Sequence, residues 1–282
     1  MRVTIQQIQD MKKHGEKIPM LTAYDYPTAR ILDDAKIPLL LVGDSLGNVV
    51  LGYETTVPVT LEDMLHHTKA VARGAKTSHV IGDMPFLTYQ TTIPDALRNA
   101  GRFMQEAGAN SVKLEGGAVM AETVNALVER GIPVMGHIGL TPQSVNQIGL
   151  KAQGRTIDAA QKLLDDAVIL QEAGAYAIVL EAVPATLAKM ITERLSIPTI
   201  GIGAGPDCDG QVQVISDMLG LFTDFVPKHV KQYAHLAESM RDAISNYKSD
   251  VTKGSFPTHE HSFTFSNGVE EELVQEMKKN IH

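Results

Sequence analysis

The sequence predicts an α/β protein, a (β/α)8 TIM barrel with an N-terminal helix and a C-terminal tail. Two observations lead to this fold class. Short apolar runs of strand length occur eight times along the 282 residues, and segments with apolar residues at helical spacing separate them. Alternating strands and helices produce a parallel sheet. Eight such units in about 250 residues fit a closed barrel better than the alternative, an open doubly wound sheet.

The expected elements follow in chain order. Residues 1–16 are expected to form a helix that precedes the barrel. The eight expected strands are 19–23, 37–43, 79–83, 111–115, 132–137, 175–181, 197–203 and 222–226. The whole chain, 1–282, is expected to form a single barrel domain. Its last part, 249–282, is polar and has little periodicity before 269–281, so we expect a C-terminal extension there.

The segments before and after the strands differ in length. Gly108 and Gly174 each stand in the sequence Glu-Ala-Gly-Ala and suit the left-handed residue that ends a helix. The segments that leave two of the strands, 45–60 and 138–156, are long and polar. Long loops at one end only are typical of the working face of a barrel.

Composition excludes several classes of protein. The chain has 25 Lys and Arg against 33 Asp and Glu, and the resulting net charge of −8 opposes binding to nucleic acid. Cys208 is the only cysteine, so the chain has no internal disulfide and no cysteine pair for a zinc finger. The first ten residues alternate polar and apolar, unlike a secretory signal, and the longest apolar run, 37–42, is too short to span a membrane. We therefore expect a cytoplasmic protein without a membrane or nucleic-acid partner.

Five of the expected strands end in polar or charged side chains. An apolar strand has no packing reason to end in a charge unless that charge meets water, a metal or a ligand. Taken alone, Asp44 or Asp83 is more simply a helix cap or a turn residue. Together, four carboxylates at one barrel mouth would repel one another unless a cation or shared protons relieve them, and oxygen ligands favour Mg2+. The candidate residues at the strand ends are Asp44, Ser45, Asp83, Lys113, Glu115, His137 and Glu181.

Two of these positions have a structural alternative. Lys113 and Glu115 are two residues apart on one strand, so both side chains point to the same face, which in a barrel is the inside. They could instead form a buried structural ion pair. His137 could be a hydrogen-bonded core histidine, and no HxxxH spacing supports zinc.

Gly201, Gly203 and Gly205 form a GxGxG sequence after the seventh strand, which is not the GxGxxG of dinucleotide-binding proteins. A backbone anion site or a simple tight turn both fit this sequence. No Gly-x-Ser-x-Gly sequence occurs, and Cys208 has no evident partner, so nucleophilic serine or cysteine catalysis is disfavoured.

Several longer strings resemble the ketopantoate hydroxymethyltransferase family. They lie at residues 21–25, 42–47, 82–86, 112–116, 135–143, 200–205, 209–212 and 256–263. This resemblance, which runs nearly from end to end, implies a barrel of the phosphoenolpyruvate mutase and isocitrate lyase superfamily. It also implies a homo-oligomer, a decamer, that acts in pantothenate and coenzyme A synthesis. One departure is an apparent insertion of Pro227, Lys228 and His229, which leaves the start of the last helix open.

The resemblance also implies a reaction. A hydroxymethyl group passes from the co-substrate 5,10-methylenetetrahydrofolate to 3-methyl-2-oxobutanoate, giving 2-dehydropantoate through a Mg-stabilised enolate. Asp44, Asp83 and Glu115 would hold one Mg2+ per subunit, and Glu181 would accept the proton. The keto-acid contacts would be Asp44, Ser45, Asp83 and Lys113, and we add His137 to them, either as a catalytic or as a positioning residue.

Two other functions remain as alternatives. A metal-dependent C–C lyase or decarboxylase of the same superfamily would use similar ligands, but it usually has a catalytic cysteine in a lid loop, and none follows the third to sixth strands. A non-enzymatic binding barrel would have no use for four inward carboxylates. Turnover with folate distinguishes the three.

Overall fold

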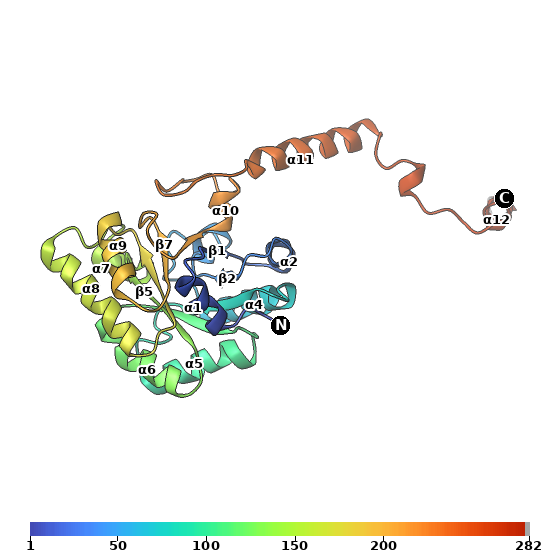
Figure 1. Cartoon of the computed structure of the whole chain (residues 1–282). Helices are drawn as coiled ribbons and strands as arrows, with labels where there is room; N and C mark the ends of the chain where they lie inside the picture. Colours follow the sequence, from blue (N-terminus) through green and yellow to red (C-terminus); the bar gives the residue numbers. More distant parts are fainter. Residues whose placement is uncertain (280–282) are drawn as a thin grey trace. The chain divides into compact units, whose positions relative to one another are not determined.

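The structure, a computed structural model, describes residues 1–279 (Figure 1). The chain separates into two compact units, Met1–Ala234 and His235–His282. The first unit contains every strand of the barrel, and all the candidate residues at the strand ends lie within it.

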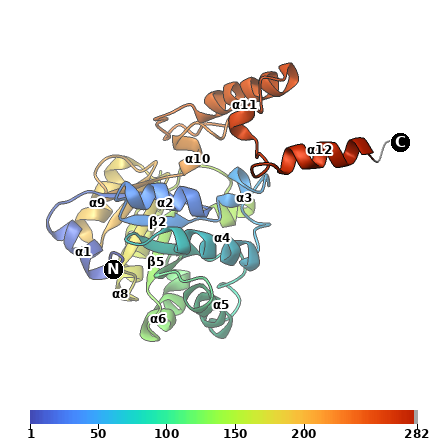
Figure 2. The same cartoon turned by 90° about the vertical axis from the view of Figure 1, so that its right-hand side faces the viewer.

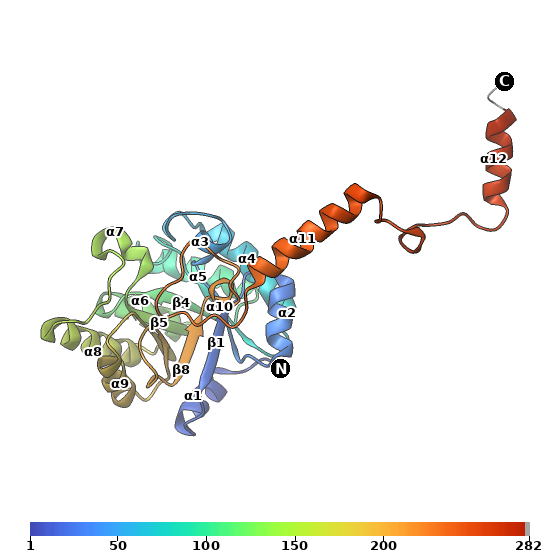
Figure 3. The ribbon, with the colours of Figure 1, turned by 90° about the horizontal axis from the view of Figure 1, so that it is seen from above.

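Eight parallel strands in chain order close into a barrel, which confirms the predicted (β/α)8 fold. Figure 3 shows the helices arranged around this barrel. The strands are β1 (Ile18–Thr22), β2 (Leu39–Val42), β3 (His79–Asp83), β4 (Ser111–Glu115), β5 (Val134–Gly139), β6 (Ala177–Glu181), β7 (Thr199–Ile202) and β8 (Gly210–Gln213). The expected helix in residues 1–16 is α1 (Ile5–Lys13).

Helices follow each strand of the first unit except β7, and α2, α4, α5 and α6 lie next to one another along one side (Figure 2). After α1 the helices are α2 (Tyr26–Asp34), α3 (Leu46–Val49), α4 (Leu61–Gly74), α5 (Ile93–Gln105), α6 (Ala121–Glu129), α7 (Val145–Ile148), α8 (Ile157–Glu172), α9 (Ala185–Arg194) and α10 (Ile215–Met218). Within residues 1–279 no helix is both long enough and apolar enough to cross a membrane.

Threonine side chains fix where several helices begin. Thr4, Thr60, Thr92 and Thr156 each accept a hydrogen bond from a backbone N–H in the first turn of the following helix. At Thr60 the bond is reciprocal, because Asp63 accepts one from the backbone N–H of Thr60. Such caps satisfy N–H groups that have no partner inside the helix.

Two apolar clusters stabilise the barrel. One lies between the strands and the surrounding helices and includes Leu40, Val80 and Phe103. The other fills the barrel interior with residues of alternate strand positions such as Met20 and Ile200. Ile8 of α1 belongs to this inner cluster and is fully buried, so α1 closes the barrel at the end opposite the charged strand ends.

The eighth strand is not at residues 222–226, so that prediction was wrong. Strand β8 begins at Gly210, and the preceding residues 203–209 form a turn without a helix. β8 has only four residues, and its buried positions alternate with exposed or half-buried glutamines, so it produces no apolar run. In contrast, Phe225 is 68% exposed, because the apolar side chains of 222–226 do not enter the core.

The second unit contains α11 (Leu236–Lys253) and α12 (Val269–Lys279). The expected boundary of the extension, residue 249, falls inside α11, and the structure divides the chain at His235 instead. The helix continues past this position because it lacks a stop signal until Gly254, which adopts the left-handed conformation at φ 71°. The helix that follows the apparent insertion at 227–229, α11, thus begins at Leu236.

Candidate active site

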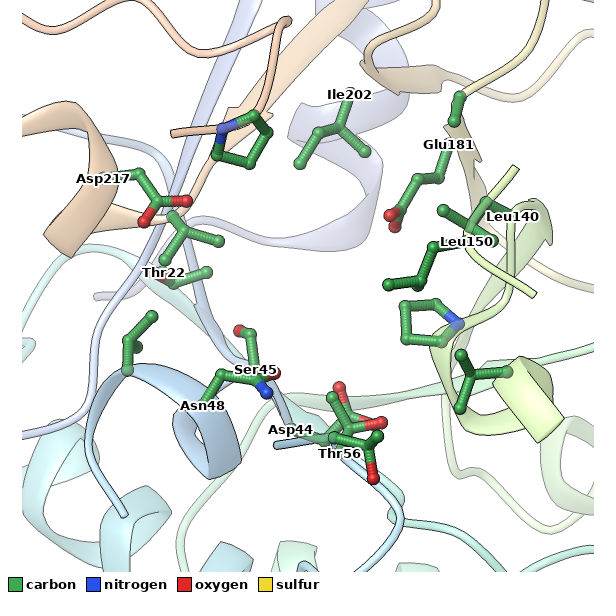
Figure 4. A pocket seen from close by; sticks show the side chains of 18 of the residues that line it. Thr22, Asp44, Ser45, Asn48, Thr56, Leu140, Leu150, Glu181, Ile202 and Asp217 are labelled. Atoms are coloured by element: carbon green, nitrogen blue, oxygen red, sulfur yellow. The ribbon is translucent and has the colours of Figure 1, made fainter. Parts of the chain in front are cut away.

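A cavity of about 790 Å3 opens at the carboxyl ends of the strands (Figure 4). Its wall includes all seven candidate residues at the strand ends: Asp44, Ser45, Asp83, Lys113, Glu115, His137 and Glu181. The structure therefore brings together the residues that the strand ends predicted.

Asp44 and Asp83 are buried next to each other. The backbone N–H of Asp44 donates a hydrogen bond to Asp83 Oδ2 over 3.2 Å. Burial, followed by repulsion from Asp83 and Glu115, raises the pKa of Asp44 well above its ordinary value. Burial also raises the pKa of Asp83, although Lys113 opposes this. A cation between the two carboxylates would relieve this repulsion.

Lys113 supplies positive charge beside this pair. Its Nζ lies 2.8 Å from Asp83 Oδ1 and 3.2 Å from His137 Nδ1. Burial opposes the charge, but the carboxylates of Asp83, Glu115 and Asp44 outweigh it and raise the pKa of Lys113 above its usual value. Lys113 is therefore a buried ammonium that faces the cavity, as its position on the strand predicted.

His137 lies between two carboxylates. Its Nδ1 is 3.5 Å from Glu115 Oε1, and its Nε2 is 3.2 Å from Glu181 Oε2. Burial and Lys113 oppose protonation of the ring, but Glu115 and Glu181 outweigh them and raise its pKa to about 9. Burial likewise opposes ionisation of Glu115, and hydrogen bonding to His137 overcomes this and lowers the pKa of Glu115.

Gln143, which the sequence analysis did not single out, connects this cluster. Its side-chain Nε2 donates to Asp44 Oδ2 and to the carbonyl of Met84, each over 2.9 Å. Its backbone N–H donates to Glu115 Oε2 over 3.1 Å, and its Oε1 accepts a 2.7 Å bond from the Tyr89 hydroxyl. Gln143 lies inside one of the family-like strings, 135–143, but no local pattern marks a glutamine as a carboxylate partner.

Ser45 lies beside Asp44 at the start of α3. The hydroxyls of Ser45 and Tyr24 are 2.9 Å apart and share a hydrogen bond. Burial raises the pKa of Tyr24, so its hydroxyl stays neutral and the pair can orient a hydrogen toward the cavity. Tyr24 also escaped the sequence analysis, although it lies in the string 21–25.

The glycine sequence lies apart from the charged cluster. Gly203 and Gly205 adopt positive φ of 63° and 82° and border a second cavity. A Cβ on Gly205 would come within 2.4 Å of Ala185 Cβ, and one on Gly201 within 3.0 Å of Cys208 Sγ. Close packing in a tight turn therefore accounts for these glycines, and the anion site stays a prediction.

The carboxylates of the cavity offer oxygen ligands for a divalent cation. Within residues 1–279 no three His, Cys, Asp or Glu side chains form a ready-made metal site. Asp83 Oδ1 and Glu115 Oε1 are nevertheless buried, and in this part of the chain they face the cationic groups already described, Lys113 Nζ at 2.8 Å and His137 Nδ1 at 3.5 Å. Hard cations such as Mg2+ take oxygen ligands and keep several waters. Asp44 and Asp83 fit such an ion, provided that water and substrate oxygens complete its shell.

Comparison with known proteins identifies the family. The family model of ketopantoate hydroxymethyltransferase matches residues 2–259. A 3-methyl-2-oxobutanoate hydroxymethyltransferase of Dehalococcoides mccartyi is 64% identical over 274 residues, which are 97% of both chains. One from Chloroflexus aurantiacus is 64% identical over 262 residues, which are 93% of both chains.

Solved structures show the same fold at low identity. A 2,3-dimethylmalate lyase of the PEP mutase/isocitrate lyase superfamily aligns with a TM-score of 0.60 at 16% identity, over 99% of each chain. A phosphonopyruvate hydrolase aligns with a TM-score of 0.61 at 12% identity, over 100% of this chain and 98% of the other. The sequence relatives and the extent of the family match show that the chain belongs to the ketopantoate hydroxymethyltransferase family.

Proposed function

We propose that this enzyme transfers a hydroxymethyl group from 5,10-methylenetetrahydrofolate to 3-methyl-2-oxobutanoate with the help of Mg2+, forming 2-dehydropantoate for pantothenate synthesis. The names of its relatives support the acceptor and the group transferred. The observation that carries the proposal is the convergence of the strand-end residues on one cavity. This cavity contains carboxylates that can bind a cation, the buried ammonium of Lys113 and, on another wall, the carboxylate of Glu181.

The keto acid is an anion and requires positive charge and hydrogen-bond donors. Lys113 supplies the charge, and the Ser45 hydroxyl, backed by Tyr24, supplies a donor. Asp44 and Asp83 would hold the divalent ion next to Lys113. When bound, Mg2+ would act as a Lewis acid toward the carbonyl oxygen of the keto acid.

Glu181 is the group that we assign to remove the proton from C3. It stands at the end of β6, its side chain is 17% exposed, and His137 Nε2 lies 3.2 Å from its Oε2. This contact orients the carboxylate and leaves its other oxygen for the substrate. Lys113 remains close enough to the keto acid to stabilise negative charge that develops on it.

Carbon–carbon bond formation completes the transfer. One water hydrolyses the two C–N bonds of the folate's methylene group, which releases tetrahydrofolate and leaves the carbon as a carbonyl at the oxidation level of formaldehyde. The electron pair that the C3–H bond leaves behind forms a new bond from C3 to this carbon, and the carbonyl oxygen takes up a proton to become the hydroxyl. The chain's own contribution is to hold the keto acid, to take the C3 proton on Glu181 and to keep the two substrates adjacent.

The direct test is turnover. The protein is incubated with 3-methyl-2-oxobutanoate, methylenetetrahydrofolate and Mg2+, and 2-dehydropantoate is measured by mass spectrometry. We expect product only when all three are present. Cleavage of a 2-hydroxy- or 2-oxo-dicarboxylic acid without folate, and no 2-dehydropantoate, would instead favour the lyase.

A further inference from the structure

The cavity has a second wall that the keto acid does not need. This wall includes Thr22 from β1 and Val212 from β8. Val214 and Phe222, which come after β8 in the sequence, also lie on it. Its side chains are mostly apolar. A buried carboxylate lies among them, that of Asp217 in α10, and Figure 4 shows Asp217 and Glu181 on opposite sides of the cavity.

Asp217 is buried without a partner. The residue is 7% exposed, and burial alone raises the pKa of its carboxyl to about 6, since no hydrogen bond or ion pair within residues 1–279 contributes. Asp33 is a useful contrast, because it is also buried but accepts four hydrogen bonds from Thr77 and Ser78. Because the Asp217 carboxylate has little exposure and accepts no hydrogen bond from the described residues, a ligand in the cavity can supply the donors that it lacks.

The size of the cavity leaves room for that ligand. Pockets for drug-sized molecules measure about 300 to 1,000 Å3, and the cavity of about 790 Å3 lies within this range although the keto acid is far smaller. In the proposed function, Lys113 and its neighbouring carboxylates bind the keto acid and its metal ion. The second wall is therefore left for a larger molecule with flat apolar faces and paired N–H donors.

We propose that Asp217 binds the pterin ring of the folate co-substrate. The pyrimidine edge of a pterin presents a ring N–H and an exocyclic amino group side by side, and the two oxygens of a carboxylate match this pair. Val212, Val214 and Phe222 contact the faces of the ring. This inference rests on the proposed function, because it takes the folate as the second substrate.

The test compares Asp217→Asn with wild type in two assays. Binding of tetrahydrofolate in the presence of 3-methyl-2-oxobutanoate is measured by calorimetry, and the KM for methylenetetrahydrofolate by turnover. The variant has one acceptor fewer and a donor that opposes the ring N–H, so both constants rise by about 30-fold or more. The folate-independent exchange of the C3 deuterium stays within about threefold of wild type, since it depends only on the keto-acid wall.

Asp224→Asn is the matched control, because Asp224 borders the same cavity but is exposed. It should leave both folate constants unchanged within about twofold. A 2-desamino-2-methyl tetrahydrofolate adds a second test. Wild type should lose at least about tenfold in affinity for this analogue, whereas Asp217→Asn should lose little, because the two changes remove the same hydrogen bond.

The outcomes separate this inference from the proposed function. Unchanged tetrahydrofolate affinity in Asp217→Asn, or equal discrimination against the desamino analogue in both proteins, would overturn the role of Asp217 while C3 exchange and turnover still support the transferase. Loss of C3 exchange in the variant would also overturn it, since Asp217 would then act on the keto acid or the fold. A wild-type protein that forms no 2-dehydropantoate would refute the proposed function itself.

Discussion

The side-chain amide of Gln143 donates a hydrogen bond to Asp44 Oδ2 over 2.9 Å, although the two residues are 99 positions apart. Through its backbone N–H, Gln143 also holds Glu115 Oε2. A single residue in the segment that follows β5 thus holds two carboxylates, that of Asp44 after β2 and that of Glu115 at the end of β4. These two contacts help to fix the relative positions of Asp44 and Glu115 in the charged cluster.

Replacing Gln143 by Met keeps its size and removes both amide donors. Asp44 then loses its partner and can rotate, so the Mg2+ concentration needed for half-maximal C3 exchange should rise by about 10- to 100-fold. Gln90→Met is the control, because Gln90 donates to Gln143 Oε1 over 3.3 Å and accepts from the Tyr89 backbone N–H over 3.4 Å, but within the described residues it has no hydrogen bond to Asp44 or Glu115. An unchanged Mg2+ requirement in Gln143→Met would show that Asp44 needs no such support.

Activity should depend on a divalent ion held by Asp44 and Asp83. Asp83→Asn keeps the shape of the side chain and removes a charge, so turnover should fall by at least about 100-fold and should not recover with excess Mg2+. Excess EDTA should stop the wild-type enzyme, and added Mg2+ should restore it. Full turnover in EDTA would refute the metal site.

Stability should fall in mild acid because of His79. This histidine is buried, with Nε2 2.9 Å from the Ser111 hydroxyl, and burial lowers its pKa from 6.5 to about 4. Between these two pH values the unfolded chain binds a proton that the folded chain excludes. The free energy of unfolding should therefore fall as pH drops from 6.5 toward 4, by at most about 1.4 kcal/mol per pH unit from this group.

Urea unfolding of wild type and His79→Gln across this pH range measures that contribution. The variant lacks the titrating ring, so its stability should depend less on pH than that of wild type. Equal slopes in the two proteins would mean that His79 titrates normally in the folded state.

Closure of the barrel should depend on Gly210. A Cβ at this position would lie 2.3 Å from the backbone oxygen of Ile18, so Gly210→Ala forces β1 and β8 apart. We expect a loss of about 1 to 3 kcal/mol in the free energy of unfolding. Gly101→Ala in α5 is the control, because a Cβ there meets nothing within 4 Å, and it should be neutral or stabilising. Similar unfolding midpoints for both variants would contradict this packing argument.

Most of the candidate site could be predicted because all strands of a parallel barrel end on the same side. Residues at the carboxyl ends of the strands therefore lie close together, even when they are far apart in the sequence. A charged residue such as Asp83 or Glu181 at the end of an apolar strand must meet the others at one end of a parallel barrel. This rule needs only strand positions, and it correctly placed the inward pair Lys113 and Glu115 as well.

The remaining features depend on contacts that no local pattern records. β8 could not be recognised, because the strand has no apolar run. Its first residue, Gly210, is required by the close packing against Ile18 of β1, which the local sequence does not show. Gln143 and Tyr89 look like ordinary loop residues until the fold places them beside Asp44 and Glu115. Asp217 follows β8, so the missed strand also hid its place on the cavity wall.

The central claim is that Glu181 removes the C3 proton of the keto acid. Glu181→Gln keeps the shape of the side chain but lacks a basic oxygen. Exchange of deuterium at C3 of 3-methyl-2-oxobutanoate, followed by NMR with Mg2+ and without folate, should slow by about 100-fold or more while the affinity for the keto acid stays near that of wild type. Glu54→Gln, at an exposed residue on the same cavity, should exchange at the wild-type rate. Wild-type exchange in Glu181→Gln would contradict the claim and give the role of the base to another group, with His137 as the next candidate.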